Sequence, residues 1–268
     1  MKNLWPDPAE LGWYAVIRRM RSWSRTDSEA EVIRRSVELA RRLASVCGLP
    51  SAPMSACFRG LAHTVYFRTQ GLSIVDRLTD AGLSRWRAFT EEMRSVDRAI
   101  FITAHVGPFQ LQMDLLSTLE KEITLIYRSY RWGPLKAEVE SLRLASDRFS
   151  YVETVASRRI AAAFLSGRSL AFLGDVPRRR PGRALRLFEE EILDDAPVRL
   201  ALRRGAPMFV GGLYTEEHAI GSGGDGLHRF GVTYTRVDPA DAAGTAASYA
   251  AAMERFLSVN RKDWIQPR

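Results

Sequence analysis

The side chains best suited to chemistry come directly after short apolar segments in the middle of this 268-residue chain. Four such segments are each followed by one polar or charged residue, namely His105, Arg128, Glu153 and Asp175. If the segments are parallel strands, their carboxyl ends meet at one edge of a sheet, where the ligand sites of open α/β sheets form. We therefore predict a site at this edge, with these four residues around it.

His105 lies in the sequence TAHVGPFQ, which has the composition of a turn from a strand into a helix. Gly107 permits a tight turn, and Pro108 suits the first position of a helix. Backbone N–H groups at such a helix start can bind an anion or an oxyanion. A histidine here is either a general base or a structural hydrogen-bonding residue, and the sequence leaves both interpretations open.

The remaining histidines carry weaker signals. His63 falls within a predicted helix, and we interpret it as structural. His218 and His228 flank the glycine-rich segment GSGGDG, and we expect both to be solvated.

The pattern of apolar residues changes near residue 98. Residues 1–97 are typical of helices, which we predict over 28–47, 52–70 and 75–94. After residue 98 we predict strands over 99–104, 123–127, 149–152 and 169–173, with helices at about 108–120, 133–147, 156–167, 194–204 and 240–258. Residues 208–210 and 230–234 are predicted to pair as an antiparallel hairpin.

Strands that alternate with helices indicate βαβ units and a parallel sheet covered on both faces. We predict an α/β fold with a mainly parallel sheet flanked by helices and an all-helical N-terminal segment. The whole chain, 1–268, is expected to form one domain, in which the helical segment 1–97 packs on the α/β core 98–268.

The charge of the chain favours acidic partners. The net charge is +8, and all but four of the 39 basic residues are arginine, which binds phosphate, sulfate and carboxylate groups through paired N–H donors. No nucleic-acid-binding motif accompanies this charge, and no glycine-rich nucleotide loop is present, so we expect neither nucleic acid nor a cofactor. A GC-rich genome is the alternative explanation for the excess of arginine, because alanine and glycine are also abundant.

Two cysteines, Cys47 and Cys57, have no metal-ligand spacing and no disulfide framework. We expect reduced thiols, no metal site and a cytoplasmic location. No apolar run is long enough for a membrane span, and the segment Leu11–Ile17 is followed by arginines, so membrane contact is expected to be at most peripheral.

Five segments, in order along the chain, have the pattern of a known family. They are Ala99–Gln110, Ile126–Arg128, Ala162–Asp175, Leu200–Pro207 and Arg261–Arg268. Together they resemble the lipid A late acyltransferases of the lysophospholipid acyltransferase-like superfamily, whose motif is His followed five residues later by Glu or Asp.

The resemblance implies a reaction. His105 would act as general base on an acceptor hydroxyl, which attacks an acyl thioester or an acyl phospholipid. The motif carboxylate would orient the imidazole and stabilise its cation. Arg128 would bind an anionic group of the acceptor, and N–H groups near Gly107 would stabilise the oxyanion.

The chain departs from the family pattern at three places. Gln110 occupies the carboxylate position, and an amide can orient the ring but cannot offset its charge. Asp114, one helical turn later, is a substitute beyond the expected reach of His105. The membrane helix common at the N-terminus of the family is missing, and residues 176–195 are rich in arginine and glutamate, either as a self-paired loop or as a basic entrance.

The sequence is therefore compatible with three functions. The leading hypothesis is an acyltransferase-like enzyme that accepts an acyl group from a donor on an acidic carrier protein, with a partner subunit as an open alternative. The second is a secondary-metabolism enzyme that closes a ring by intramolecular substitution and expels sulfate or phosphate. It needs an anion clamp (Arg128, Arg131 or Arg178) and a base (Asp175, Asp114 or His105). The third is a non-catalytic subunit or binding module.

Overall fold

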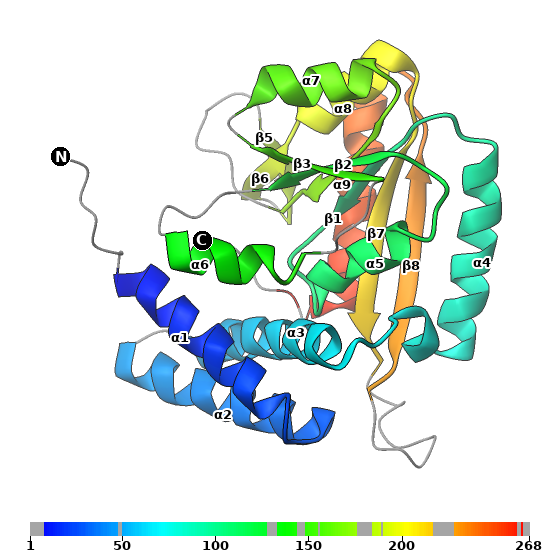
Figure 1. Cartoon of the computed structure of the whole chain (residues 1–268). Helices are drawn as coiled ribbons and strands as arrows, with labels where there is room; N and C mark the ends of the chain where they lie inside the picture. Colours follow the sequence, from blue (N-terminus) through cyan, green and yellow to red (C-terminus); the bar gives the residue numbers. More distant parts are fainter. Residues whose placement is uncertain are drawn as a thin grey trace.

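A computed structural model gives the three-dimensional structure of the chain (Figure 1). It describes residues 8–47, 50–127, 133–143, 148–154, 156–175, 184–188, 190–216, 228–261 and 264. The helices are α1 (Pro8–Trp23), α2 (Glu29–Cys47), α3 (Ser51–Gln70), α4 (Asp80–Arg94), α5 (Gln112–Leu116), α6 (Gly133–Glu140), α7 (Ser157–Leu165), α8 (Ala196–Arg204) and α9 (Ala242–Val259).

The described strands form one large sheet and one small hairpin. The large sheet contains β1 (Ile100–Thr103), β2 (Ile123–Tyr127), β3 (Phe149–Glu153), β4 (Ser169–Leu173), β7 (Met208–Thr215) and β8 (Phe230–Val237). Their order is β3-β2-β4-β1-β7-β8, and every neighbouring pair is parallel except β7 and β8, which are antiparallel. The predicted α/β class, the parallel sheet and the antiparallel pairing of its last two strands are confirmed.

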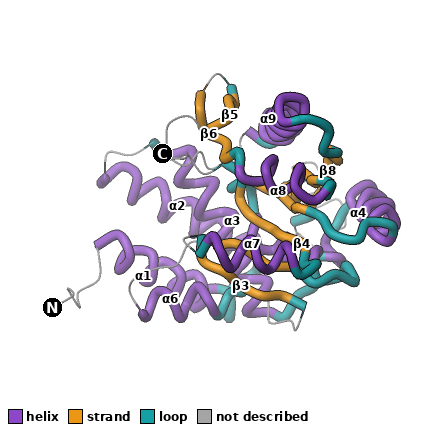
Figure 2. The backbone as a smooth tube through the Cα atoms, turned by 90° about the horizontal axis from the view of Figure 1, so that it is seen from above, coloured by secondary structure: helices purple, strands orange, loops and turns teal. Residues whose placement is uncertain are grey.

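The side chains of each strand point alternately to the two faces of the sheet, and an apolar layer covers each face. Phe101 of β1 and Phe209 of β7 point to the face covered by α4 and α5. Ile100 and Ile102 point to the opposite face, where α7, α8 and α9 lie. Successive side chains of a strand face opposite ways, so the continuous apolar runs of the sequence follow from a sheet that is buried on both faces. Figure 2 shows α8 and α9 on the opposite side of the molecule from α1.

The N-terminal helices have a core of their own and also contact the sheet layer. Buried side chains of α1, α2 and α3, such as Ile17, Val32 and Phe58, pack together with Leu135 of α6. Phe67 of α3 lies instead in the apolar layer between the sheet and α4. Helices α1 to α3 therefore lie near α6, at the end of the sheet where β1, β2 and β4 terminate (Figure 1).

The helix expected at about 133–147 ends at Glu140 as α6, and three further predicted features differ in the structure. The helix expected at 75–94 is divided into a 3-10 turn, Val75–Arg77, and α4, because Thr79 caps α4 by accepting a hydrogen bond from the Gly82 N–H at 3.1 Å. The helix expected at about 108–120 is reduced to a 3-10 turn, Phe109–Leu111, and the short α5.

The third difference lies in the segment 176–195. Its second half forms an antiparallel hairpin, β5 (Ala184–Leu187) and β6 (Glu190–Asp194), where no strand was predicted. Leu187 and Leu193 of this hairpin are buried in the layer that contains α9. Tertiary burial of these leucines explains a strand pair that the run of charges conceals in the sequence.

Candidate active site

The order of the strands brings His105 and Asp175 together. β1 and β4 are parallel neighbours, with Thr103 opposite Leu173. His105 and Asp175 each lie two residues further along, at the carboxyl ends of these strands. Gly174 makes the approach possible, because a Cβ there would lie 2.7 Å from Ile102 Cγ2.

Asp175 is fully buried and accepts three hydrogen bonds. His105 donates its backbone N–H to Oδ2 at 3.0 Å, and its ring Nδ1 lies 2.9 Å from Oδ1. The indole N–H of Trp264 donates to Oδ2 at 2.8 Å. Because a carboxylate only accepts, Nδ1 carries the proton of the neutral ring, and Nε2 is left as the proton acceptor.

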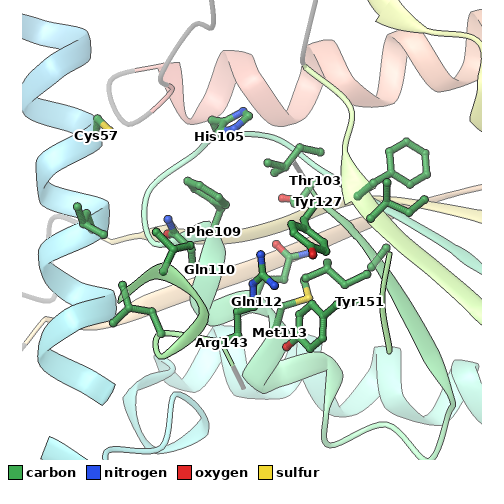
Figure 3. Close-up of a pocket in the computed structure, with 18 of the residues that line it drawn as sticks. Cys57, Thr103, His105, Phe109, Gln110, Gln112, Met113, Tyr127, Arg143 and Tyr151 are labelled. Carbon is green, nitrogen blue, oxygen red and sulfur yellow. The ribbon is translucent and has the colours of Figure 1, made fainter. Parts of the chain in front are cut away.

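His105 lines a cavity of about 340 Å³ between the sheet and the N-terminal helices (Figure 3). A cavity of this size is in the range of small-molecule sites. Its walls are mainly apolar and come from both halves of the chain, as shown by Trp13, Ile17, Leu61, Phe101, Leu125 and Leu135. The His105 side chain is 23% exposed, so Nε2 belongs to a ring that solvent and ligands can reach.

Polar groups interrupt the apolar wall at a few points. Thr103 and Gln112 line the cavity from β1 and α5, and Arg143 lines it from the turn after α6. Gln112 is 1% exposed, and its Oε1 has no hydrogen-bond partner among the described residues. This oxygen lies against Gly212 of β7, in the space that a Cβ at that position would occupy.

Gln110 does not hold the histidine ring. Its Oε1 accepts a hydrogen bond from the Thr64 hydroxyl at 3.3 Å, while Asp175 occupies Nδ1 of His105. The expectation that the motif position orients the ring is corrected: the carboxylate comes from the end of β4. Gln110 still lines the cavity.

Asp114 is paired elsewhere. Its Oδ1 lies 2.6 Å from Arg68 Nη2 of α3, and burial raises the pKa of this carboxyl while Arg68 opposes the rise. Asp114 is absent from the described lining of the cavity, so the structure does not place it with His105.

The other predicted site residues are scattered. Glu153 ends β3 opposite Tyr127 and does not line the cavity in the described part of the chain. Arg128, Arg131 and Arg178 lie outside the described residues.

Gly107 has a φ of +49°, as the predicted tight turn requires. The helix expected after it is only a 3-10 turn followed by five residues of α5, whose first turn lies beyond Gln110. A helix this short has a small macrodipole and adds little to anion binding, so the oxyanion site near Gly107 stays a prediction that depends on backbone N–H groups alone.

A second histidine pair lies away from the cavity. His63 Nδ1 is 3.0 Å from Glu29 Oε1, and both side chains are completely buried. His228 packs against His63 with ring centroids 4.8 Å apart and is 8% exposed, so the expectation that His228 is solvated is wrong. Its place in the core beside Phe230 explains the difference, and His218 lies outside the described residues.

Two other kinds of feature are absent from the described ranges of the chain. No group of three or more His, Cys, Asp or Glu side chains there could hold a metal ion. None of the described helices is long and apolar enough to cross a membrane. No protein-family model and no curated protein matches the sequence.

Three residues of the site were missed by sequence reasoning. Trp264 lies in a segment that resembles the acyltransferases, but its bond to Asp175 depends on a contact across 89 residues. Arg143 and Gln112 occur in predicted helices and carry no local sign of a cavity. Only the packing of α5 and α6 against the sheet reveals them.

Proposed function

We propose that this protein is an acyltransferase-like enzyme in which His105 is the general base. The observation that carries the proposal is the His105–Asp175 pair beside an apolar cavity. Nε2 would take the proton of an acceptor hydroxyl or amine, and Asp175 would stabilise the imidazolium that forms.

The reaction balances without another reagent. The acceptor oxygen or nitrogen forms a bond to the acyl carbon of a thioester, and the carbon–sulfur bond breaks. The thiolate leaves with the electron pair and receives the proton held at His105 Nε2. General-base assistance of this kind contributes about 10²–10⁴-fold to the rate.

The apolar walls support an acyl chain as the group that fills the cavity. Each methylene moved from water into such a wall contributes about 0.8 kcal/mol. The charge of +8 supports a donor on an acidic carrier protein, because opposite charge speeds encounter. Such a donor also favours a cytoplasmic location for the enzyme.

Thioester cleavage tests the proposal. Octanoyl-CoA and an octanoyl carrier protein are incubated with the wild-type protein and with His105→Ala, and thiol release is followed by absorbance. We expect the wild type to cleave one of the two donors and His105→Ala to lose about 10²–10⁴-fold of that rate.

The control is Gln70→Ala, which removes a side chain at the end of α3 that is not among the described residues lining the cavity. It should retain the rate to within about threefold, since Gln70 contacts no part of the proposed substrate site. Cleavage that is unaffected by His105→Ala, or a wild type that cleaves neither donor, contradicts acyl transfer.

A second reaction is favoured by one observation, the cation Arg143 in the same cavity. In an intramolecular substitution, an amine nitrogen forms a bond to a carbon of its own molecule. The carbon–oxygen bond to a sulfate or phosphate group breaks, and the anion leaves with the electron pair. His105 would take the ammonium proton. Release of the inorganic anion from an amino-sulfate ester, without thioester cleavage, would support this reaction over acyl transfer.

A further inference from the structure

Arg143 is held in the cavity wall by aromatic rings. Its guanidinium carbon lies 3.8 Å from the centre of the Tyr127 ring and 5.1 Å from that of Tyr151. The side chain is 18% exposed, and Figure 3 shows it among the cavity residues. Stacking on a ring fixes the guanidinium plane and leaves its N–H edges available.

Those N–H groups bind no other described residue. Within the described part of the chain, the Arg143 guanidinium donates no hydrogen bond, and Glu140 approaches it only to 3.7 Å. Glu140 is 41% exposed, and an ion pair of this length in water is weak. No Asp or Glu is found among the described residues that line the cavity, so the charge meets no carboxylate there.

A partly buried cation with unused donors is costly unless something pairs with it. We propose that Arg143 binds an oxyanion of the substrate, a carboxylate, sulfate or phosphate ester attached to an apolar body that fills the cavity. The reacting group at the other end of that body lies at His105. The inference rests on the proposed function only in taking this cavity as the substrate site.

Binding of a matched series tests the proposal. Nonanoate, octyl sulfate and 1-octanol, each below its micelle concentration or solubility limit, are titrated into the protein by calorimetry. The three probes share one chain and differ in the terminal group. We expect at least one anion to bind about tenfold or more tightly than octanol, and the tighter anion identifies the preferred oxyanion.

Arg143→Gln should abolish this preference and leave the dissociation constant of octanol within about threefold. Arg87→Gln is the matched control, because it removes the same charge from an exposed position of α4 that does not line the cavity. It should keep the preference.

Arg143→Lys is a second variant for the case that Arg143→Gln does not fold. It retains the charge without the paired donors, so it should keep part of the preference for the anion. The proposal is overturned if octanol binds as tightly as both anions, or if the preference survives in Arg143→Gln. It is also overturned if both Arg143 variants weaken octanol and anions equally.

The test of anion binding at Arg143 can succeed or fail independently of the proposed acyl transfer. His105→Ala should retain the preference for the anion while losing any thioester cleavage. Loss of the preference in Arg143→Gln, with thioester cleavage absent from the wild type, would keep the oxyanion site and reject acyl transfer.

Discussion

His105 and His63 form two pairs with similar geometry in different surroundings. Each ring has Nδ1 near a carboxylate oxygen, at 2.9 Å from Asp175 and at 3.0 Å from Glu29. The His105 side chain is 23% exposed and lines a cavity, whereas the His63 and Glu29 side chains have no exposed surface. The distance between ring and carboxylate therefore does not distinguish a catalytic pair from a structural one.

The second ring nitrogen makes the distinction. Nε2 of His63 is buried without a hydrogen-bond partner among the described residues, and the rings of His228 and Phe230 enclose it. No substrate can reach a proton held there. Nε2 of His105 belongs to a ring that lines the cavity, so only this pair can exchange a proton with a ligand.

Replacing the two carboxylates by amides gives the largest expected contrast. Asp175→Asn should lower the thioester cleavage rate by about 10³–10⁴-fold, because an amide cannot stabilise the imidazolium. Glu29→Gln should leave that rate within about threefold and lower the free energy of unfolding by about 1–3 kcal/mol. Thiol release and denaturant unfolding measure the two effects, and equal losses of rate in both variants would contradict the comparison.

The buried pair is expected to make stability depend on pH through His228. Burial lowers the pKa of His228 to about 4, with His63 and Arg59 adding to the decrease and Glu29 opposing it. The unfolded chain takes up this proton first, so the stabilisation is present above about pH 6.5 and is lost as the pH falls toward 4. Allowing for residual solvent contact, the loss is about 2 kcal/mol.

His228→Gln removes this titrating group. The free energy of unfolding of wild type minus variant, measured by denaturant at several pH values, should therefore decrease by that amount between pH 7 and pH 4. A difference that does not change with pH would show that His228 is not held neutral in the folded protein.

The smallest expected effect comes from removing the hydrogen bond that Trp264 donates to Asp175. Trp264→Phe removes the N–H donor at Oδ2 and keeps an aromatic ring, so the carboxylate is less firmly oriented. We expect about a tenfold loss of thioester cleavage, which corresponds to one hydrogen bond. The control Trp86→Phe removes an indole hydrogen bond from α4 to Thr118 and should leave the rate unchanged. Similar rates in both variants would indicate that Asp175 needs no third donor.

Much of the fold could be predicted because the patterns involved are local. β2 and β4 have the predicted bounds, since apolar runs of five residues between helical segments are typical of buried parallel strands. The hairpin β5–β6 could not be predicted, because its two short strands, ALRL and EEILD, follow an arginine-rich stretch and show no regular alternation of apolar and polar residues. The helix expected after Pro108 was too long, since burial against the sheet, not periodicity, sets where α5 ends.

The sequence by itself determined that His105 and Asp175 follow strands, because side-chain alternation and turn residues act over a few positions. Only the tertiary structure decided that β4 lies beside β1, which places the two residues together across 70 positions of the chain. It also decided that α1, α3 and α6 close a cavity over His105 and bring Arg143 into its wall. The physical reason is that strand order and helix packing arise from apolar surface buried between distant segments, and no local pattern encodes which segments meet.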